Sequence, residues 1–139
     1  MKKPHHLLAL FILLGFIFSS FMQSSPEKLI IGKWKLETIV SADSVQSPLG
    51  AAINKFLTGI IFEYKQDSSV ALEFPEKEKE ENTIKLTPTR YYFFTEKEKC
   101  FLVHVQNKFE TNYEILTLNA ETLSYKENNT TYLFTRFKK

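Results

Sequence analysis

The sequence predicts an all-β protein, an up-and-down antiparallel meander that closes into a small barrel. From Ile31 onward, apolar residues recur with period two, which is typical of strands that bury one face. Short polar connections follow one another at a spacing of roughly 8–12 residues, so neighbouring strands are expected to pair as hairpins. The chain of 139 residues suits a single domain. A sheet with so many strands protects its edges best by closing on itself.

The first strand is expected over 31–40, where Trp34, Leu36 and Thr38 alternate with charged residues and should share the buried face. Period two predicts eight further strands, over 60–65, 70–74, 83–86, 90–95, 101–106, 111–118, 123–126 and 131–137.

One short helix is expected after the first strand. A polar loop over 41–48 precedes it, and within 50–57 the apolar residues Ile53, Phe56 and Leu57 recur at helical spacing. We expect this helix to plug or flank one end of the sheet. The strand 90–95 is apolar on both faces, so it is expected to be covered on both sides, and this helix is a candidate cover.

A charged run at 75–82 is expected to be a solvated loop between strands. The mature chain contains neither an internal repeat nor a second domain.

The first 25 residues resemble a secretory signal peptide. Two lysines precede an unbroken apolar run over 7–18, and small polar residues follow up to Pro26. We therefore expect residues 1–25 to be a signal peptide or membrane anchor and residues 26–139 to form the barrel. Cleavage is expected near Ser24 or Ser25; an uncut anchor is the alternative. The mature protein is predicted to be exported to the periplasm or cell envelope, or to be secreted.

The chemistry of the mature chain excludes several function classes. Without Lys2 and Lys3, basic and acidic residues are equal in number, so no basic face for nucleic acid is expected. The single cysteine, Cys100, cannot form an internal disulfide and is interpreted as a small core residue. The only mature histidine, His104, is interpreted as an ordinary strand residue. No metal site, cofactor or catalytic constellation is predicted, so an enzyme is not expected.

Two segments resemble the secreted lipocalin-like domain family, in particular the small lipocalin-like domains common in Bacteroidetes. The first is the Gly-x-Trp entry at Gly32 and Trp34, and the second comprises a Tyr-x-Ile strand at 113–115 and a Tyr-x-Phe-x-Arg strand at 132–136. The resemblance implies a calycin-type barrel. It also implies that Trp34 closes one end by packing against Arg136, a structural role shared with Gly32.

The aromatic residues leave two functional interpretations open. Either the rings fill a small barrel, or they line an apolar pocket with tyrosine hydroxyls that orient a ligand. The candidate pocket lining is Leu36, Phe62, Tyr64, Leu72, Tyr113, Ile115 and Tyr125.

The predicted function is binding of a small apolar molecule outside the cytoplasm. The alternative is a structural or protein-interaction module of the cell envelope, with a filled barrel and no ligand. Membrane contact is expected only through an uncleaved N-terminal segment. The sequence determines neither the ligand, the protein partner nor the oligomeric state.

Overall fold

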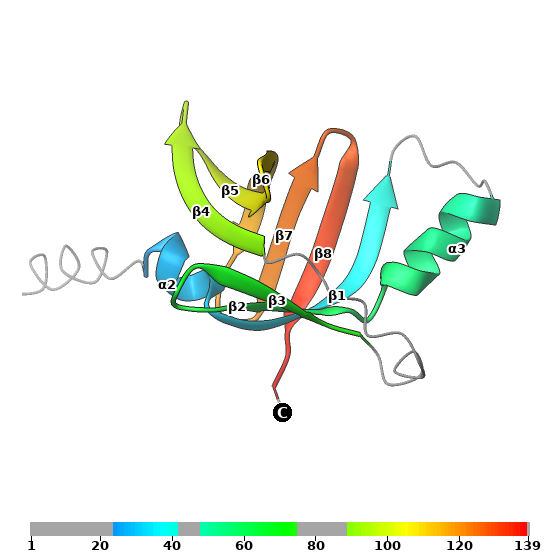
Figure 1. Ribbon diagram of the computed structural model, residues 1–139. Coiled ribbons are helices and arrows are strands. Elements are labelled where there is room, and N and C mark those ends of the chain that lie inside the picture. The colour runs from blue at the N-terminus through cyan, green and yellow to red at the C-terminus, as the bar shows by residue number, and fades with distance from the viewer. Residues whose placement is uncertain (1–23, 42–47, 75–88, 139) are drawn as a thin grey trace, which may run out of the picture.

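The computed structural model describes residues 24–41, 48–74 and 89–138. Eight antiparallel strands form a closed barrel, in which each strand is hydrogen-bonded to the next and β8 returns to β1 (Figure 1). This confirms the all-β meander with one short helix after the first strand. The predicted strand at 83–86, the charged run at 75–82 and the N-terminal apolar segment lie outside the described residues.

The elements follow the order expected from the sequence, with one addition, the short helix α2 before β1. They are α2 (Pro26–Ile30), β1 (Gly32–Ser41), α3 (Pro48–Leu57), β2 (Ile61–Tyr64), β3 (Ser69–Glu73), β4 (Thr89–Glu96), β5 (Lys99–Gln106), β6 (Phe109–Leu118), β7 (Thr122–Glu127) and β8 (Thr130–Arg136). In the described part of the chain, no helix combines the length and apolar character needed to cross a membrane.

A β-bulge in β1 changes which residues face the core. The register between β1 and β8 shifts between Leu36 and Thr38, so that Ile39 pairs with Tyr132 and packs against the core. Thr38, which strict alternation places inside, is instead exposed. A bulge adds one residue to a strand and moves every later side chain to the opposite face, and the sequence pattern does not reveal it.

The core combines aliphatic and aromatic side chains from nearly every strand. Its buried cluster comprises Ile30, Trp34, Leu36, Tyr64, Tyr91, Leu102, Leu123, Tyr125 and Phe134. Several ring pairs meet edge to face, as Phe62 and Phe134 do, whose centroids are 5.3 Å apart at 86°, and others are tilted. The quadrupoles of aromatic rings favour such edge-to-face contacts, and the rings fill the barrel densely.

The barrel wall is weakest between β3 and β4. Only two residue pairs, Ser69 with Arg90 and Val70 with Thr89, join these strands within the described residues, whereas eight pairs join β4 to β5. Backbone pairing is therefore least extensive on this side of the barrel.

The helix α3 lies beside β1 and not over β4, which corrects the expectation that it covers the apolar strand. In Figure 1 it is on the opposite side of the barrel from α2, and Leu57 packs against the core. Its residues Leu49, Ile53 and Phe56 are 71%, 49% and 47% exposed. Tyr92 in β4 is also exposed, so one face of that strand reaches solvent.

Candidate functional site

One end of the barrel, which we call the floor, is closed by the contact between Trp34 and Arg136. The guanidinium carbon lies 3.8 Å from the centroid of the indole ring, and the two residues are partners in the β1–β8 register. The predicted contact is therefore present. A guanidinium over an indole face gains a cation–π attraction that increases as water is excluded. Burial lowers the pKa of Arg136, although the group remains charged at any physiological pH.

The same two side chains hold α2 in place. The Trp34 indole donates to the Ile30 carbonyl at 2.6 Å, and the Arg136 guanidinium donates to the carbonyls of Leu29 and Ile31, each at 2.7 Å. The last carbonyls of a helix have no partner within the helix, so these bonds satisfy groups that would otherwise stay unpaired. The floor is thus a single unit of helix end, indole and guanidinium.

Gly32 is required at this point for two reasons. Its φ is +123°, a backbone conformation that side chains disfavour, and a Cβ atom there would lie 2.6 Å from Nη1 of Arg136. The expected structural set of Gly32, Trp34 and Arg136 is therefore assembled in one place.

Burial decreases from the floor toward the other end of the barrel, which we call the mouth. The mouth is the end where β1 finishes and the β7–β8 turn lies, at the top of Figure 1. Trp34, Leu123 and Phe134 are at most 2% exposed. Four inward-facing residues towards the mouth, Ile39, His104, Tyr113 and Tyr132, are only partly buried. Leu102, the register partner of Tyr113, is fully buried.

A chain of hydrogen bonds crosses the barrel between these two ends. Tyr64 and His104 are joined at 3.0 Å between the hydroxyl and Nε2, and the Tyr125 hydroxyl is hydrogen-bonded to Tyr64. Because the His104 imidazole is neutral at pH 7, its tautomer decides whether Nε2 accepts from the Tyr64 hydroxyl or donates to it. The sequence predicts only an ordinary strand histidine at this position. His104 in fact faces inward, as its alternation with Leu102 along β5 indicates.

The shifted pKa values leave the buried histidine and tyrosine side chains of the interior uncharged at neutral pH. Burial lowers the pKa of His104 to about 4, so the imidazole is uncharged at neutral pH. Burial also raises the pKa of Tyr64, Tyr113 and Tyr125, and all three therefore keep their protons at physiological pH.

Tyr113 and Tyr132 form an aromatic corner on the side of the mouth. Their ring centroids are 6.2 Å apart and their planes meet at 88°, so the two rings are almost perpendicular. Tyr125 lies beneath them, with centroid distances of 4.6 Å to Tyr113 and 5.4 Å to Tyr132. The Tyr113 hydroxyl is hydrogen-bonded to the side chain of Thr111. The corner is a partly exposed surface of ring edges, ring faces and hydroxyls.

Glu127 adds a carboxylate to this end of the barrel. Alternation from the buried Tyr125 turns Glu127 inward, and its register partner Thr130 donates to the Ser41 hydroxyl at 3.3 Å across the rim. The charge of Glu127 contributes, after burial, to the raised pKa values of Tyr113 and Tyr132. The inner face at this end of the barrel therefore carries a carboxylate.

The predicted lining residues lie on the inner face at different depths. Leu36, Tyr64 and Tyr125 are buried, whereas Phe62, Tyr113 and Ile115 are partly buried and pack against the core. Leu72 is partly buried and pairs with Phe62 across the β2–β3 ladder. The deeper three are part of the packed core, so only the shallower residues of the predicted set are candidates for contact with a ligand.

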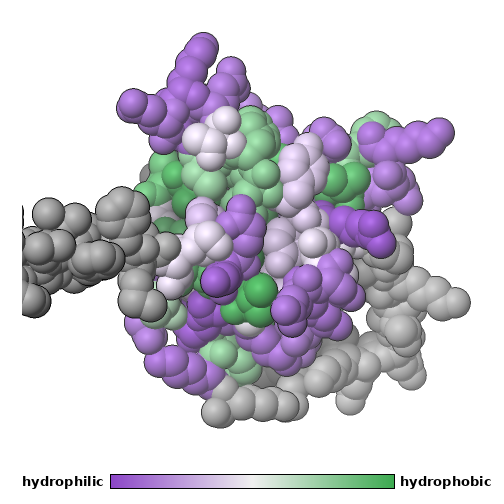
Figure 2. All heavy atoms as spheres, turned by 90° about the vertical axis from the view of Figure 1, so that its left-hand side faces the viewer, coloured by the Kyte–Doolittle hydropathy of each residue, from purple (hydrophilic) through white to green (hydrophobic). Residues whose placement is uncertain are grey.

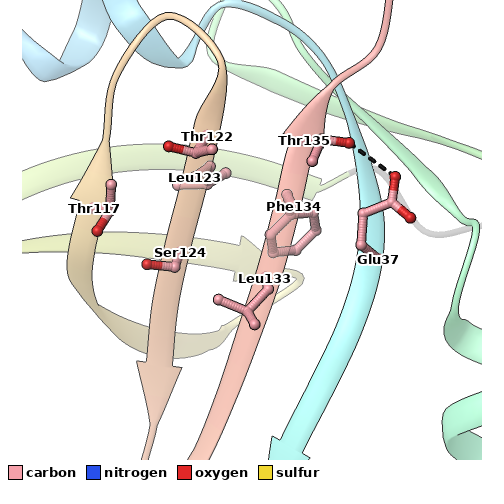
Figure 3. Close-up of a pocket in the computed structure, with 8 residues that line it drawn as sticks. All are labelled: Glu37, Thr117, Thr122, Leu123, Ser124, Leu133, Phe134 and Thr135. Carbon is pink, nitrogen blue, oxygen red and sulfur yellow. Dashed lines mark hydrogen bonds between the residues drawn. The ribbon is translucent and has the colours of Figure 1, made fainter.

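A shallow groove of about 260 Å³ crosses the outside of the barrel over β6, β7, β8 and β1 (Figure 3). It is lined by Glu37, Thr117, Thr122, Leu123, Ser124, Leu133, Phe134 and Thr135. The Thr135 hydroxyl donates to Glu37 at 2.8 Å, which lowers the pKa of that carboxyl. Its polar groups are mostly hydroxyls on the solvent side of the sheet.

A second hollow lies beside α2, between that helix, β4 and the β2–β3 turn. Figure 2 shows this side of the molecule, where hydrophilic and hydrophobic groups alternate over short distances. Glu27 and Lys28 lie next to Ile31 and Tyr92 along its edge. The hollow has a volume of about 450 Å³, and half of its lining residues are aliphatic or aromatic, namely Ile31, Tyr91, Tyr92 and Phe93.

No group of three or more His, Cys, Asp or Glu side chains within the described ranges is arranged to hold a metal ion. Burial raises the pKa of the Cys100 thiol, and nearby Glu27 raises it further, so the thiol is protonated and weakly nucleophilic at neutral pH.

A comparison with protein-family models, curated proteins and solved structures finds no match.

Proposed function

We propose that the protein binds a small, largely apolar molecule at the mouth of its barrel, as lipocalin-like binding proteins do. The observation that carries this proposal is the gradient of burial along the interior. Trp34 and Arg136 close the floor, whereas Ile39, Tyr113 and Tyr132 at the mouth remain partly exposed. Apolar walls with a few placed hydroxyls are typical of small-molecule sites.

Polar groups at the mouth favour a ligand with an apolar body and one hydrogen-bonding group. The hydroxyls of Tyr113 and Tyr132 are protonated at neutral pH, because burial raises both pKa values. They offer hydrogen bonds without a formal charge of their own.

Titration with N-phenylnaphthylamine, an uncharged apolar fluorophore, tests the proposal. Saturable enhancement of its fluorescence is expected for the wild type, and Ile39→Lys should weaken it because a longer, charged side chain would replace apolar surface beside Tyr132. Val40→Lys is the matched control, since Val40 is the next residue of β1 and is 52% exposed. Equal binding by both variants, with folding verified by circular dichroism, would contradict a site at the mouth.

We further propose that the protein acts outside the cytoplasm. The support is the basic start at Lys2 and Lys3 and the apolar run that follows, which form the pattern of a signal peptide. N-terminal sequencing of the protein from its native host should find a mature terminus near Ser24 or Ser25. A cytosolic protein that retains Met1 would refute this proposal.

The second candidate function is a structural or interaction module of the cell envelope. The exposed apolar ridge of α3 favours it, because Leu49, Ile53 and Phe56 lie on one side of the helix and are all substantially exposed. Under this alternative the fluorophore would not bind at the mouth. Substituting serine for the three residues would instead abolish association with a partner.

A further inference from the structure

We infer that the ligand carries an ammonium group, which binds between the Tyr113–Tyr132 corner and the carboxylate of Glu127. This inference rests on the proposed function, since it assigns the chemical class of the molecule that occupies the mouth. It names an organic cation with an apolar body, such as an arylalkylamine.

The aromatic corner offers partly exposed aromatic surface to a cation. Tyr113 and Tyr132 form an edge-to-face pair, with centroids 6.2 Å apart and planes at 88°, and both residues are partly exposed. A cation within about 6 Å of a ring centroid is attracted by the negative face of the ring. A cation bound beside this pair would lie close to both rings.

Glu127 supplies a charge that forms no salt bridge within the described part of the chain. The neighbouring Lys126 turns outward and pairs with Glu114 at 3.3 Å. Thr130 and Ser41 border Glu127 on the rim with hydroxyls. A carboxylate at a half-buried rim is stabilised by an opposite charge, and a bound ammonium would provide one.

Two other basic residues that the structure describes, His104 and Arg136, do not compete for this position. His104 is neutral at pH 7, since burial lowers its pKa to about 4. Arg136 is at the floor, where carbonyl oxygens and the indole ring of Trp34 engage its guanidinium. At neutral pH the mouth therefore favours a cation over an anion of the same shape.

Three ligands with the same apolar body separate the alternatives. They are 2-phenylethylamine, 2-phenylethanol and phenylacetate, which present an ammonium, a hydroxyl and a carboxylate. Calorimetric titration at pH 7 should give the amine an affinity roughly 5–10-fold higher than the alcohol, as expected for a partly exposed ion pair with a cation–π contact. Phenylacetate should bind least well, and added salt should reduce the preference for the amine.

Glu127→Gln tests the carboxylate directly, because it preserves the shape of the side chain and removes its charge. The preference for the amine over the alcohol should disappear in this variant. Glu110→Gln is the matched control, since Glu110 lies on the outer face, where it accepts from the Tyr92 hydroxyl at 3.3 Å. It changes the net charge equally and should keep the preference.

The possible results distinguish the two proposals. Equal binding of the amine and the alcohol by the wild type, or tighter binding of phenylacetate, would overturn the ammonium site and leave the apolar site intact. Loss of the preference in both glutamine variants would overturn the assignment to Glu127. If neither the three ligands nor the fluorophore bind, the proposed function itself fails.

Discussion

The floor and the mouth of the barrel use similar residue types for different purposes. At the floor, Trp34 is fully buried, and its polar atom and those of Arg136 are bonded to backbone carbonyls. At the mouth, Tyr113, Tyr132 and Glu127 are partly exposed, and Glu127 has no salt-bridge partner within the described ranges. Polar groups that are hydrogen-bonded within the protein stabilise the fold, whereas accessible polar groups can form hydrogen bonds or ion pairs with a ligand. Substitutions at the two ends should therefore separate stability from binding.

Trp34→Ala should have the largest effect on stability. It removes a fully buried indole, its bond to Ile30 and the surface on which Arg136 rests. The free energy of unfolding should fall by roughly 3–5 kcal/mol, the range for loss of a buried aromatic residue. Urea denaturation followed by circular dichroism measures the loss. A variant as stable as the wild type would show that the floor does not close the barrel.

Acidification should weaken the fold through His104. Burial lowers its pKa in the folded state to about 4, below the ordinary value of 6.5. The unfolded chain therefore binds a proton first, and this contribution to stability, present above pH 6.5, is lost as the pH falls toward 4. The loss should approach an upper limit of about 3 kcal/mol at low pH.

Thermal melts of wild type and His104→Gln between pH 7 and pH 4.5 measure this effect. The difference in melting temperature between the two proteins should change with pH, because the variant lacks the titrating group. Parallel pH profiles would indicate that His104 is hydrated and not a member of the buried hydrogen-bond chain with Tyr64.

Gly32→Ala should cost about 1–3 kcal/mol, the range for a strained backbone position. Its added methyl also meets Nη1 of Arg136. Gly59→Ala is a useful comparison, since Gly59 has a φ of +94° as well, and its backbone N–H donates to the carbonyl of Leu36. If the contact with Nη1 contributes, Gly32→Ala should cause a smaller loss of stability in an Arg136→Ala background than in the wild type. If the stability losses of the two single variants simply add in the double variant, backbone strain alone explains the effect of Gly32→Ala.

Tyr132→Leu should have the smallest effect on stability and a clear effect on binding. Tyr132 is partly buried, and leucine retains much of its apolar volume, so the unfolding free energy should change by less than about 1.5 kcal/mol. The fluorophore should nevertheless bind more weakly, because one wall of the corner is lost. A destabilisation comparable to that of Trp34→Ala would show that the mouth is as tightly packed as the floor.

Most of the barrel could be predicted from the sequence because period two is a direct consequence of strands with one buried face. The contact of Trp34 with Arg136 followed from a family resemblance. The helix α2 was missed, since five residues are too few to show helical periodicity, although Ser25 and Pro26 before Glu27 are a typical helix start.

The details of the mouth could not be predicted in the same way. The bulge after Leu36 turns Ile39 inward, and no residue type in this segment signals the extra residue. Glu127 is the last residue of β7, and a polar residue at this point of the sequence is equally consistent with a turn and with the end of a strand. His104 required knowledge of which strands face each other, because its partner Tyr64 is 40 residues away in the sequence.

Two-dimensional NMR during a titration with 2-phenylethanol, an uncharged ligand, tests most directly whether the mouth binds a small apolar molecule. The ring resonances of Tyr113 and Tyr132 and the amides around Ile39 should shift saturably, while the indole resonance of Trp34 should remain unchanged. Saturable shifts confined to α3 or to the outer groove around Ser124, or no saturable shift at all, would contradict a binding site at the mouth of the barrel.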